Sequence, residues 1–377
     1  MIHDKKYSQI ILTIVLFYQI ILKSGLDYID AGPLWKYIGY LLYGVLLYLI
    51  IIKLIDSSFS LKSWLLVAMY FSILVLFLLV GNLSVASVFL FGLFSIFLTL
   101  EGVITAYLYA VVGGLITAFG LSLFGVIPIY NEAIDYWVFG FKNPNNVGYY
   151  LMVIFVLLLV KQWKKPSKYL FMYFLFMLLV DKFILFDDTA LLTSVLFIMM
   201  WVITTLAPKM FAVSYVRKII IAIPSLLTLL TLVLGYLYGI LNFVTKVNQI
   251  FTLRPAIWKY YLTNFKPKLI GSNIPPVVSA YNNAFDGMYL YYPLANGLLV
   301  SLVLLVLLSF SLYYLLKTNN LPVLCLMLVF LVFGFSENAP AIVYSSPLFV
   351  FALMACFKLV NDKEYFSSEV RLGESLK

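Results

Sequence analysis

The sequence predicts an all-α fold: a polytopic membrane protein with about 12 transmembrane helices and a large outer loop that carries short interfacial helices. Apolar residues make up 64% of the 377 residues, charged residues only 11%, and the mean hydropathy is +1.05. This composition excludes a water-soluble fold. Aromatic residues reach 18%, which is typical of chains that place many rings at headgroup depth. We interpret residues 1–377 as a single integral membrane domain.

Apolar windows mark the expected spans. The first window follows Asp4-Lys5-Lys6 and ends at Lys23 without a small-residue cleavage site, which favours an uncleaved span over a signal peptide. The windows long enough to cross a hydrocarbon core of about 30 Å are 8–22, 34–52, 63–80, 84–100, 102–127, 147–160, 169–186, 189–206, 219–241, 288–316, 322–335 and 346–360.

Basic residues predict the orientation of these spans. With a cytoplasmic N-terminus, sixteen of the 25 basic residues fall in inner segments and nine in outer segments. Because cytoplasmic loops carry an excess of Lys and Arg, we expect both termini, including the tail 361–377, to be cytoplasmic. The two longest segments between spans, 128–146 and 242–287, then face outward. Residues 242–287 form the large extracytoplasmic loop, and a loop of that length is more often functional than idle.

The scarcity of some residue types excludes several chemistries. Cys325 and Cys356 lie in apolar runs, where a thiol acts as a small hydrophobic side chain, so neither a disulfide nor a metal site is expected. The single histidine, His3, belongs to the N-terminal tail, which excludes histidine base catalysis and histidine metal ligation in the membrane. The sequence has no Gly-rich nucleotide loop, and we expect neither a cofactor nor a nucleic-acid partner.

The large outer loop contains the most informative basic residue. Of the three arginines, Arg217, Arg254 and Arg371, only Arg254 lies in a long polar segment between spans. A guanidinium binds phosphate through a planar fork that lysine lacks, so this position favours a site for a lipid-linked phosphate. The alternative is an arginine that reaches out to lipid headgroups.

The residues after Arg254 predict a short interfacial helix. Pro255 is the residue type expected at the first position of a helix. Apolar residues then repeat at the three-to-four spacing of an amphipathic helix, with lysines around them. The apolar positions are Ile257, Trp258, Tyr261, Leu262 and Phe265, and the basic positions are Lys259, Lys266 and Lys268.

A second polar segment, residues 139–151, opens the sixth expected span. Lys142, Asn145 and Asn146 lie there, on either side of Pro144. Asn145 or Asn146 would cap the helix that follows, and this interpretation explains the pattern by itself. The functional interpretation takes Lys142 as a contact to phosphate or sugar, beside amides that bind sugar hydroxyls.

Carboxylates and amides also mark the later spans. Asn283, Asp286 and Tyr289 lead into the tenth expected span, where the polar side chains suit sugar hydroxyls and turn formation equally well. Glu337 is one carboxylate at the outer end of an otherwise apolar span. An ionisable group at that depth predicts a functional site, with a helix cap as the alternative.

Two pairs of adjacent charged residues lie near the seventh span. Asp181-Lys182 and Asp187-Asp188 place adjacent charged residues on different sides of a helix. We interpret them as markers of the outer boundary of that span.

Taken in order, these segments resemble the Wzy-like polysaccharide polymerases, which are related to the O-antigen ligases. The PN-x-x-G element that opens a central span in that family is similar to Pro144-Asn145-Asn146-Val147-Gly148. The arginine, apolar residue and tryptophan that open its outer loop are similar to Arg254-Pro255-Ala256-Ile257-Trp258. The match covers roughly residues 139 to 340 and depends on order and topology.

The later family elements follow the same order. Gly271 is similar to the glycine turn of the family, and Asn283, Asp286 and Tyr289 to its Asn/Asp-aromatic approach to the next span. Glu337 is similar to its late carboxylate.

Two departures from the family pattern carry information. Members often have His before the PN pair, where this chain has Asn143, and the outer-loop histidine of the ligase branch is absent. The absence favours a polymerase over a ligase. Many members carry a second outer arginine, in whose place Lys142, Lys246 or Lys259 would have to serve.

The resemblance implies an inverting, metal-independent glycosyltransferase. It would join oligosaccharide repeat units carried on undecaprenyl diphosphate into O-antigen, capsule or exopolysaccharide at the outer face of the bacterial cytoplasmic membrane. Arg254 would stabilise the departing diphosphate. Glu337, with Asp286 as second choice, would accept the proton of the attacking hydroxyl. The expected substrate-binding residues are Lys142, Asn145, Asn146, Trp258, Lys259, Asn283 and Tyr289.

Other functions stay open on the sequence. A flippase or exporter of the same lipid-linked oligosaccharide would also suit twelve spans, although the sequence has no internal repeat and its polar residues concentrate in outer loops. A polysaccharide ligase is the second alternative. A third is a metal-dependent glycosyltransferase that uses Asp27 and Asp30, which we interpret instead as solvated loop residues. A flippase and a chain-length regulator are the expected protein partners of a polymerase.

Overall fold

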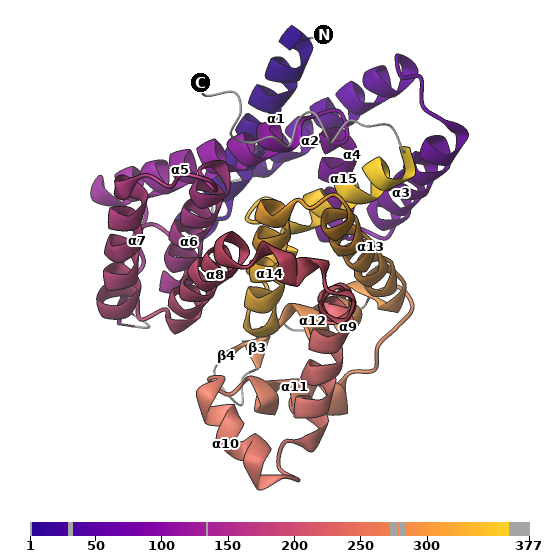
Figure 1. Cartoon of the computed structure of the whole chain (residues 1–377). Helices are drawn as coiled ribbons and strands as arrows, with labels where there is room; N and C mark the ends of the chain where they lie inside the picture. Colours follow the sequence, from indigo (N-terminus) through magenta and orange to yellow (C-terminus); the bar gives the residue numbers. More distant parts are fainter. Residues whose placement is uncertain are drawn as a thin grey trace.

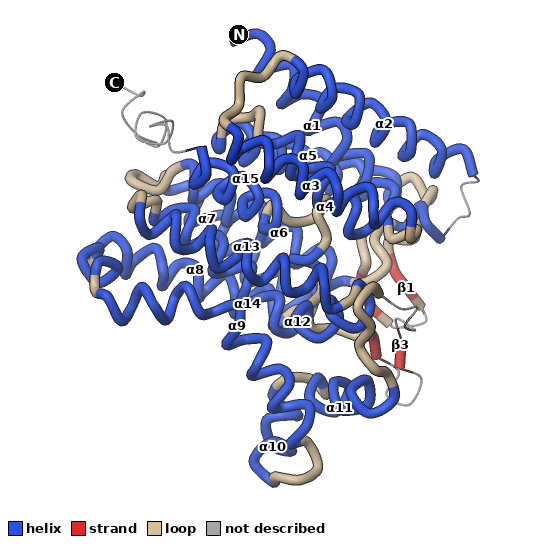
Figure 2. The backbone as a smooth tube through the Cα atoms, turned by 90° about the vertical axis from the view of Figure 1, so that its right-hand side faces the viewer, coloured by secondary structure: helices blue, strands red, loops and turns tan. Residues whose placement is uncertain are grey.

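Helices make up nearly all the regular structure of the computed structural model, which describes residues 2–28, 33–132, 135–271, 274, 277–278 and 283–361. α1 (Ile2–Leu22) begins at one end of the molecule, and α10 (Asn242–Ile250) and α11 (Arg254–Asn264) lie at the opposite end (Figure 1). In the described ranges, strands occur only as two antiparallel hairpins (Figure 2): β1 (Tyr130–Asn131) with β2 (Tyr136–Trp137), and β3 (Val277–Val278) with β4 (Asn283–Ala284). The predicted all-α class is confirmed.

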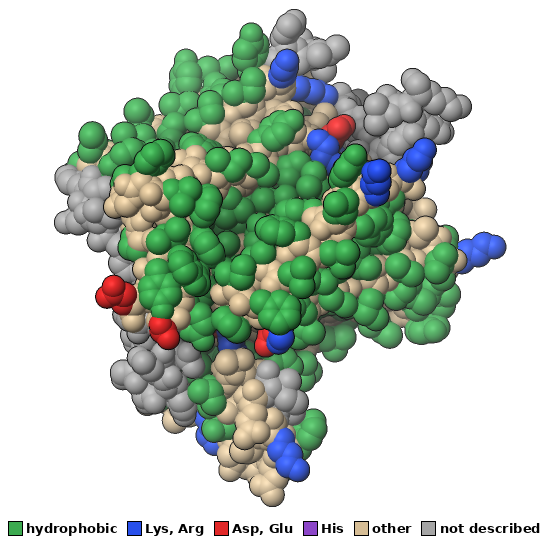
Figure 3. All heavy atoms as spheres, turned by 90° about the vertical axis from the view of Figure 1, so that its left-hand side faces the viewer, with side chains coloured by type: hydrophobic (Ala, Val, Ile, Leu, Met, Phe, Trp, Pro, Cys, Tyr) green, Lys and Arg blue, Asp and Glu red, His purple; other side chains and the backbone are tan. Residues whose placement is uncertain are grey.

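Eight helices in this part of the chain are long and apolar enough to cross a membrane. They are α1, α2 (Pro33–Ile55), α3 (Leu61–Leu79), α5 (Leu100–Leu123), α6 (Pro144–Lys161), α8 (Asp188–Leu206), α9 (Ser214–Leu237) and α13 (Leu298–Lys317). Hydrophobic side chains cover the middle of the face shown in Figure 3, and charged side chains lie toward its margins. Length, composition and this surface describe a multi-pass membrane protein.

The prediction of 12 spans is wrong. α4 (Leu83–Ser95), α14 (Leu321–Ser336) and α15 (Leu348–Asn361) are apolar but short, and their side chains are almost all buried inside the protein. The seventh window is divided between α7 (Lys168–Val180) and the π-helical segment Asp181–Leu185. A hydropathy window measures apolar content, which is the same for a helix that faces lipid and for one that is buried among other helices.

The tenth window, 288–316, is also interrupted. It contains α12 (Met288–Tyr291), a π-helical segment (Tyr292–Asn296) and α13. Gly297 separates the last two with a φ of +101°, a conformation that favours glycine. The amide of Leu298 donates to the carbonyl of Lys268 at 2.9 Å. This bond fastens the interior of the segment 242–287 to the start of α13.

The outer loop packs against protein. Trp258 and Tyr261 on α11 are fully buried. A Cβ on Gly235 of α9 would lie 2.8 Å from Leu262 Cδ1 and 3.1 Å from Trp258 Cβ, so α9 and α11 are in close contact. Of the five predicted apolar positions, Ile257, Trp258 and Tyr261 are buried, while Leu262 and Phe265 are half-buried. The helix is not distinctly amphipathic, and its buried residues pack against α9 and against Phe285. The tail 362–377 lies outside the described residues.

The start of α6 differs in one detail from the sequence prediction. Asn143 is the N-cap: its side chain accepts a hydrogen bond from the amide of Asn145 at 2.9 Å, and Pro144 follows at the first helical position. The cap was predicted at Asn145 or Asn146. Both of these residues are half-buried in the first turn, and their amide groups do not form the cap.

Candidate functional site

Arg254 enters the site from a strained turn. Thr252 and Leu253 immediately before it have φ values of +49° and +68°, a region that non-glycine residues rarely adopt. Asn248, which is buried, accepts a hydrogen bond from the amide of Ala256 at 3.0 Å and so satisfies one backbone donor in the first turn of α11. The turn and this bond fix the backbone position from which the Arg254 side chain extends.

Arg254 lies between two carboxylates that come from distant parts of the chain. Its Nη2 is 2.6 Å from Glu337 Oε1 and 3.5 Å from Asp286 Oδ2. Its Nε donates to the carbonyl of Ser336 at 3.1 Å. The side chains of Arg254 and Glu337 are only 12% and 13% exposed, so this is a desolvated ion cluster and not a surface pair. The structure therefore brings together all three residues that the sequence singled out as catalytic.

Trp258 holds the Asp286 segment in place. Its Nε1 donates to the backbone carbonyl of Asp286 at 2.9 Å, and its ring packs edge-on against Phe335, with 5.3 Å between centroids. Gly287 has a φ of +104°, and a Cβ there would lie 2.8 Å from Trp258 Nε1. Because Trp258 is fully buried, the structure places it under the cluster as a positioning residue and not on a surface that contacts sugar or lipid.

Glu337 directly follows the last turn of α14, where its backbone amide still donates to the carbonyl of Phe333 at 3.1 Å. Burial raises the pKa of Glu337 well above its ordinary value, the Asp286 carboxylate raises it further, and the guanidinium opposes both effects. Burial also raises the pKa of Asp286, again against Arg254. One cation facing several buried carboxyl groups favours retention of a proton, which is the condition of an acid–base site.

Asp187 is the residue that sequence reasoning missed. It is 2% exposed and caps α8 by accepting a hydrogen bond from the amide of Ala190 at 3.1 Å. Burial raises its pKa to about 6, against the amides of Ala190 and Thr189 and the charge of Arg254. Its charge in turn acts on Glu337. The predicted boundary marker is therefore a buried carboxylate whose charge acts on the ion cluster. Its position between two adjacent helices was the signal available in the sequence.

Gly148 of the PN-x-x-G element makes room for this carboxylate. A Cβ at Gly148 would lie 2.6 Å from Asp187 Oδ2 and 3.0 Å from Asp181 Oδ1. Asp181 is fully buried, and neither of its oxygens has a hydrogen-bond partner among the described residues. The glycine of this element thus serves a close packing contact between α6 and the turn before α8.

We expect Gly148→Ala to destabilise the protein by about 1–3 kcal/mol, because the added methyl group overpacks a site with two buried carboxylates. The thermal midpoint of the purified protein should fall by several degrees. Gly120→Ala in α5 is the matched control, because a Cβ at that helical position meets nothing within 4 Å and alanine is the better helix former. Equal midpoints for the Gly148 and Gly120 variants would contradict the packing argument.

The cluster borders a cavity through one of its members. The cavity has a volume of about 600 Å³, and Asp286 is the residue of the cluster that lines it, together with Asn338 and with Gln19 and Lys23 from the end of α1. Tyrosines 40, 43, 291, 292 and 344 complete much of its wall. The site therefore has an ion cluster and an adjoining space that could hold an organic ligand.

The other predicted substrate-binding residues are dispersed. Lys259 donates to the carbonyl of Tyr238 at 2.7 Å and so ties α11 to the end of α9. Tyr289 is buried and donates to the carbonyl of Leu331 at 2.8 Å. Lys142 is half-buried before α6 and does not line the cavity. The backbone of Asn283 belongs to β4, and its side chain lies outside the described residues.

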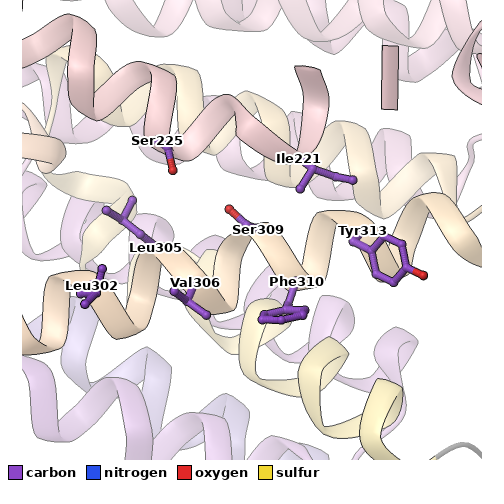
Figure 4. A pocket seen from close by; sticks show the side chains of 8 residues that line it. All are labelled: Ile221, Ser225, Leu302, Leu305, Val306, Ser309, Phe310 and Tyr313. Carbon is purple, nitrogen blue, oxygen red and sulfur yellow. The ribbon is translucent and has the colours of Figure 1, made fainter. Parts of the chain in front are cut away.

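A second cavity, of about 430 Å³, lies between α9 and α13 (Figure 4). Ser225 and Ser309 bring two hydroxyls to an otherwise apolar wall, to which Tyr313 and Phe310 contribute rings. No carboxylate, lysine or arginine lines it, so an acid–base reaction has no partners there.

In the described part of the chain, no group of three or more His, Cys, Asp or Glu side chains is arranged to hold a metal ion. The structure of this part therefore does not support a metal centre. Of the alternative pair, Asp30 and the side chain of Asp27 lie outside the described residues. No protein-family model, curated protein or solved structure matches the chain.

Proposed function

We propose that this chain is a glycosyltransferase that polymerises oligosaccharide repeat units carried on undecaprenyl diphosphate, at the outer face of a bacterial cytoplasmic membrane. The observation that carries the proposal is the convergence of Arg254, Asp286 and Glu337 beside a cavity of about 600 Å³. The order of the polar segments along the sequence, described above, supports the choice of substrate.

The proposed reaction uses groups that are already in place. The hydroxyl oxygen of the acceptor sugar attacks the anomeric carbon of the donor, and the bond from that carbon to the diphosphate oxygen breaks. Undecaprenyl diphosphate leaves with the bonding electrons, and Glu337 takes the hydroxyl proton. Arg254 stabilises the charge that grows on the leaving group, where a fixed cation in a desolvated site has its largest effect. The configuration at the anomeric carbon inverts in this single displacement.

The Arg254–Glu337 pair suggests how the base is controlled. Without substrate, Glu337 is the nearest partner of Arg254, at 2.6 Å. A diphosphate offers the same planar fork more oxygens and more charge than a carboxylate does. Arrival of the donor would therefore draw the guanidinium away from Glu337, and the raised pKa of this carboxyl group suits it to accept a proton.

The direct test uses purified full-length protein in lipid nanodiscs with lipid-linked repeat units extracted from the host. We expect new glycosidic bonds, seen by mass spectrometry as a ladder of repeat units, with equal yield in the presence of a chelator. Transfer of the saccharide to a different acceptor, with no ladder, would indicate a ligase. In liposomes, movement of the substrate between leaflets without bond formation would indicate a flippase. Either result would reject polymerisation.

A further inference from the structure

The cavity beside Asp286 is built largely from elements that contribute no residue to the ion cluster. Its walls come from the end of α1, from α2, from the start of α4 and from the segments 285–292 and 338–344. Tyr40 and Ser84 are exposed at its rim, while Phe285 and Tyr292 are buried at its floor. A ligand in this cavity would lie directly against Asp286.

Two residues that line the cavity each carry a buried polar atom without a hydrogen-bond partner in the described ranges. The hydroxyl of Tyr292, a residue 4% exposed, has no hydrogen-bond partner among the described residues. The side-chain oxygen of Asn338 is buried and also lacks one, although its amide nitrogen donates to the carbonyl of Phe285. Both residues line the cavity. An unpaired polar atom inside a protein costs about 1–3 kcal/mol, so a turn of either side chain toward a sugar hydroxyl would be favourable, whereas an acyl chain would offer no partner.

The other residues that line the cavity also suit a saccharide. Aromatic rings, of which this cavity has five from tyrosine alone, suit the C–H faces of a sugar ring and offer hydroxyls at their edges. Gln19, Ser84 and Ser87 add short polar groups. Lys23 is exposed at the end of α1 and supplies the cavity with its one lysine or arginine among the residues that line it.

We propose that this cavity is the subsite for the acceptor saccharide and that Lys23 binds an acidic group, phosphate or carboxylate, on that saccharide. The inference rests on the proposed function and assigns a role to a residue that the sequence analysis treated only as the end of the first span. Lys142, Lys246 and Lys259 were the expected second cations. None of them lines the cavity, and Lys259 is bonded to the end of α9.

The experiment measures occupancy separately from catalysis. In full-length protein in nanodiscs, Ser84→Cys places a thiol at the rim, and the two native cysteines are buried. Ser225→Cys, in the cavity between α9 and α13, is the control for lipid coverage. The probe is the repeat-unit saccharide released from the host's carrier lipid by mild acid. We expect it to slow maleimide labelling at position 84 at least tenfold and to leave labelling at position 225 unchanged.

Two variants test the named contacts without removing a wall of the cavity. Lys23→Gln should raise the saccharide concentration needed for protection about tenfold, as expected for loss of one charged hydrogen bond, and Lys23→Arg should restore it. Tyr292→Phe removes only the buried hydroxyl and should weaken protection several-fold. If prior phosphatase treatment of the saccharide removes the Lys23 effect, the acidic group is phosphate; persistence of the effect assigns carboxylate.

Protection by undecaprenyl phosphate alone, absence of protection by the saccharide, or wild-type protection in Lys23→Gln would overturn the inference. Its failure is distinct from failure of the proposed function. A repeat-unit ladder without protection at position 84 rejects the subsite and keeps the polymerase. Protection without a ladder keeps the subsite and rejects the polymerase.

Discussion

Arg254→Ala should abolish polymer formation, with a loss of at least about 10²–10³ in rate, because one fixed electrostatic donor at a leaving group is worth this much. The substitution also removes the cation that pairs with both Asp286 and Glu337 in a desolvated site. Removal of one partner from a buried ion cluster destabilises a protein by several kcal/mol. Polymer length in cells and turnover by purified protein are the measurements.

Two variants separate the roles of Arg254. Arg254→Lys keeps the charge but removes the planar fork, so it should recover stability more than activity. Arg217→Ala is the control for loss of an arginine elsewhere, since Arg217 donates to the carbonyl of Phe211 at 2.9 Å, away from the ion cluster. This variant should retain wild-type turnover. Normal polymer from a stably expressed Arg254→Ala protein would remove this residue from the mechanism.

Glu337→Gln should lower turnover by about 10²–10⁴ while the protein stays folded, because the amide fits the same space and cannot accept the proton of the attacking hydroxyl. The pH dependence provides a second test. A base must be deprotonated to act, and burial together with Asp286 raises the pKa of Glu337. Wild-type activity should therefore rise with pH as this carboxyl group loses its proton and fall as the pH drops through its pKa. Residual activity of Glu337→Gln should lack that rise.

Substitutions at two other carboxylates test whether Glu337 is the base. Asp188→Asn alters an exposed carboxylate that pairs with Lys182 at 2.9 Å, and it should leave both the rate and its pH dependence unchanged. Asp286→Asn tests the second-choice base: if it removes the pH-dependent rise and Glu337→Gln does not, the two residues exchange roles. Wild-type turnover in Glu337→Gln would reject the proposed role of this glutamate.

Local sequence patterns predicted several elements and failed at others for one physical reason. The start of α11 at Arg254-Pro255 follows from residues within one turn of each other. The number of spans was wrong because α4, α14 and α15 are apolar helices of only 13, 16 and 14 residues, too short to cross a hydrocarbon core. The fold decides where a helix ends within an apolar run, and the hydropathy of the run does not show it.

Because contacts depend on distant segments, the sequence also revealed only some of the site residues. Arg254 and Glu337 each stood out as an unusual charge for its segment. Asp187 did not, because its burial and its effect on Glu337 arise only when α6 and α8 pack together at Gly148. Lys23 at the end of the first span looked like a boundary residue, and only the fold places it in the lining of the same cavity as Asp286.

The sequence by itself determined the class of this protein and the local elements. Composition and hydropathy identify an all-α membrane protein, since the transfer of an apolar segment into lipid depends on that segment alone. The tertiary structure alone decided which helices the protein buries and which charges meet. Arg254 and Glu337 are 83 positions apart in the chain, so their contact depends on how α11 and α14 pack, and packing is a property of the whole fold.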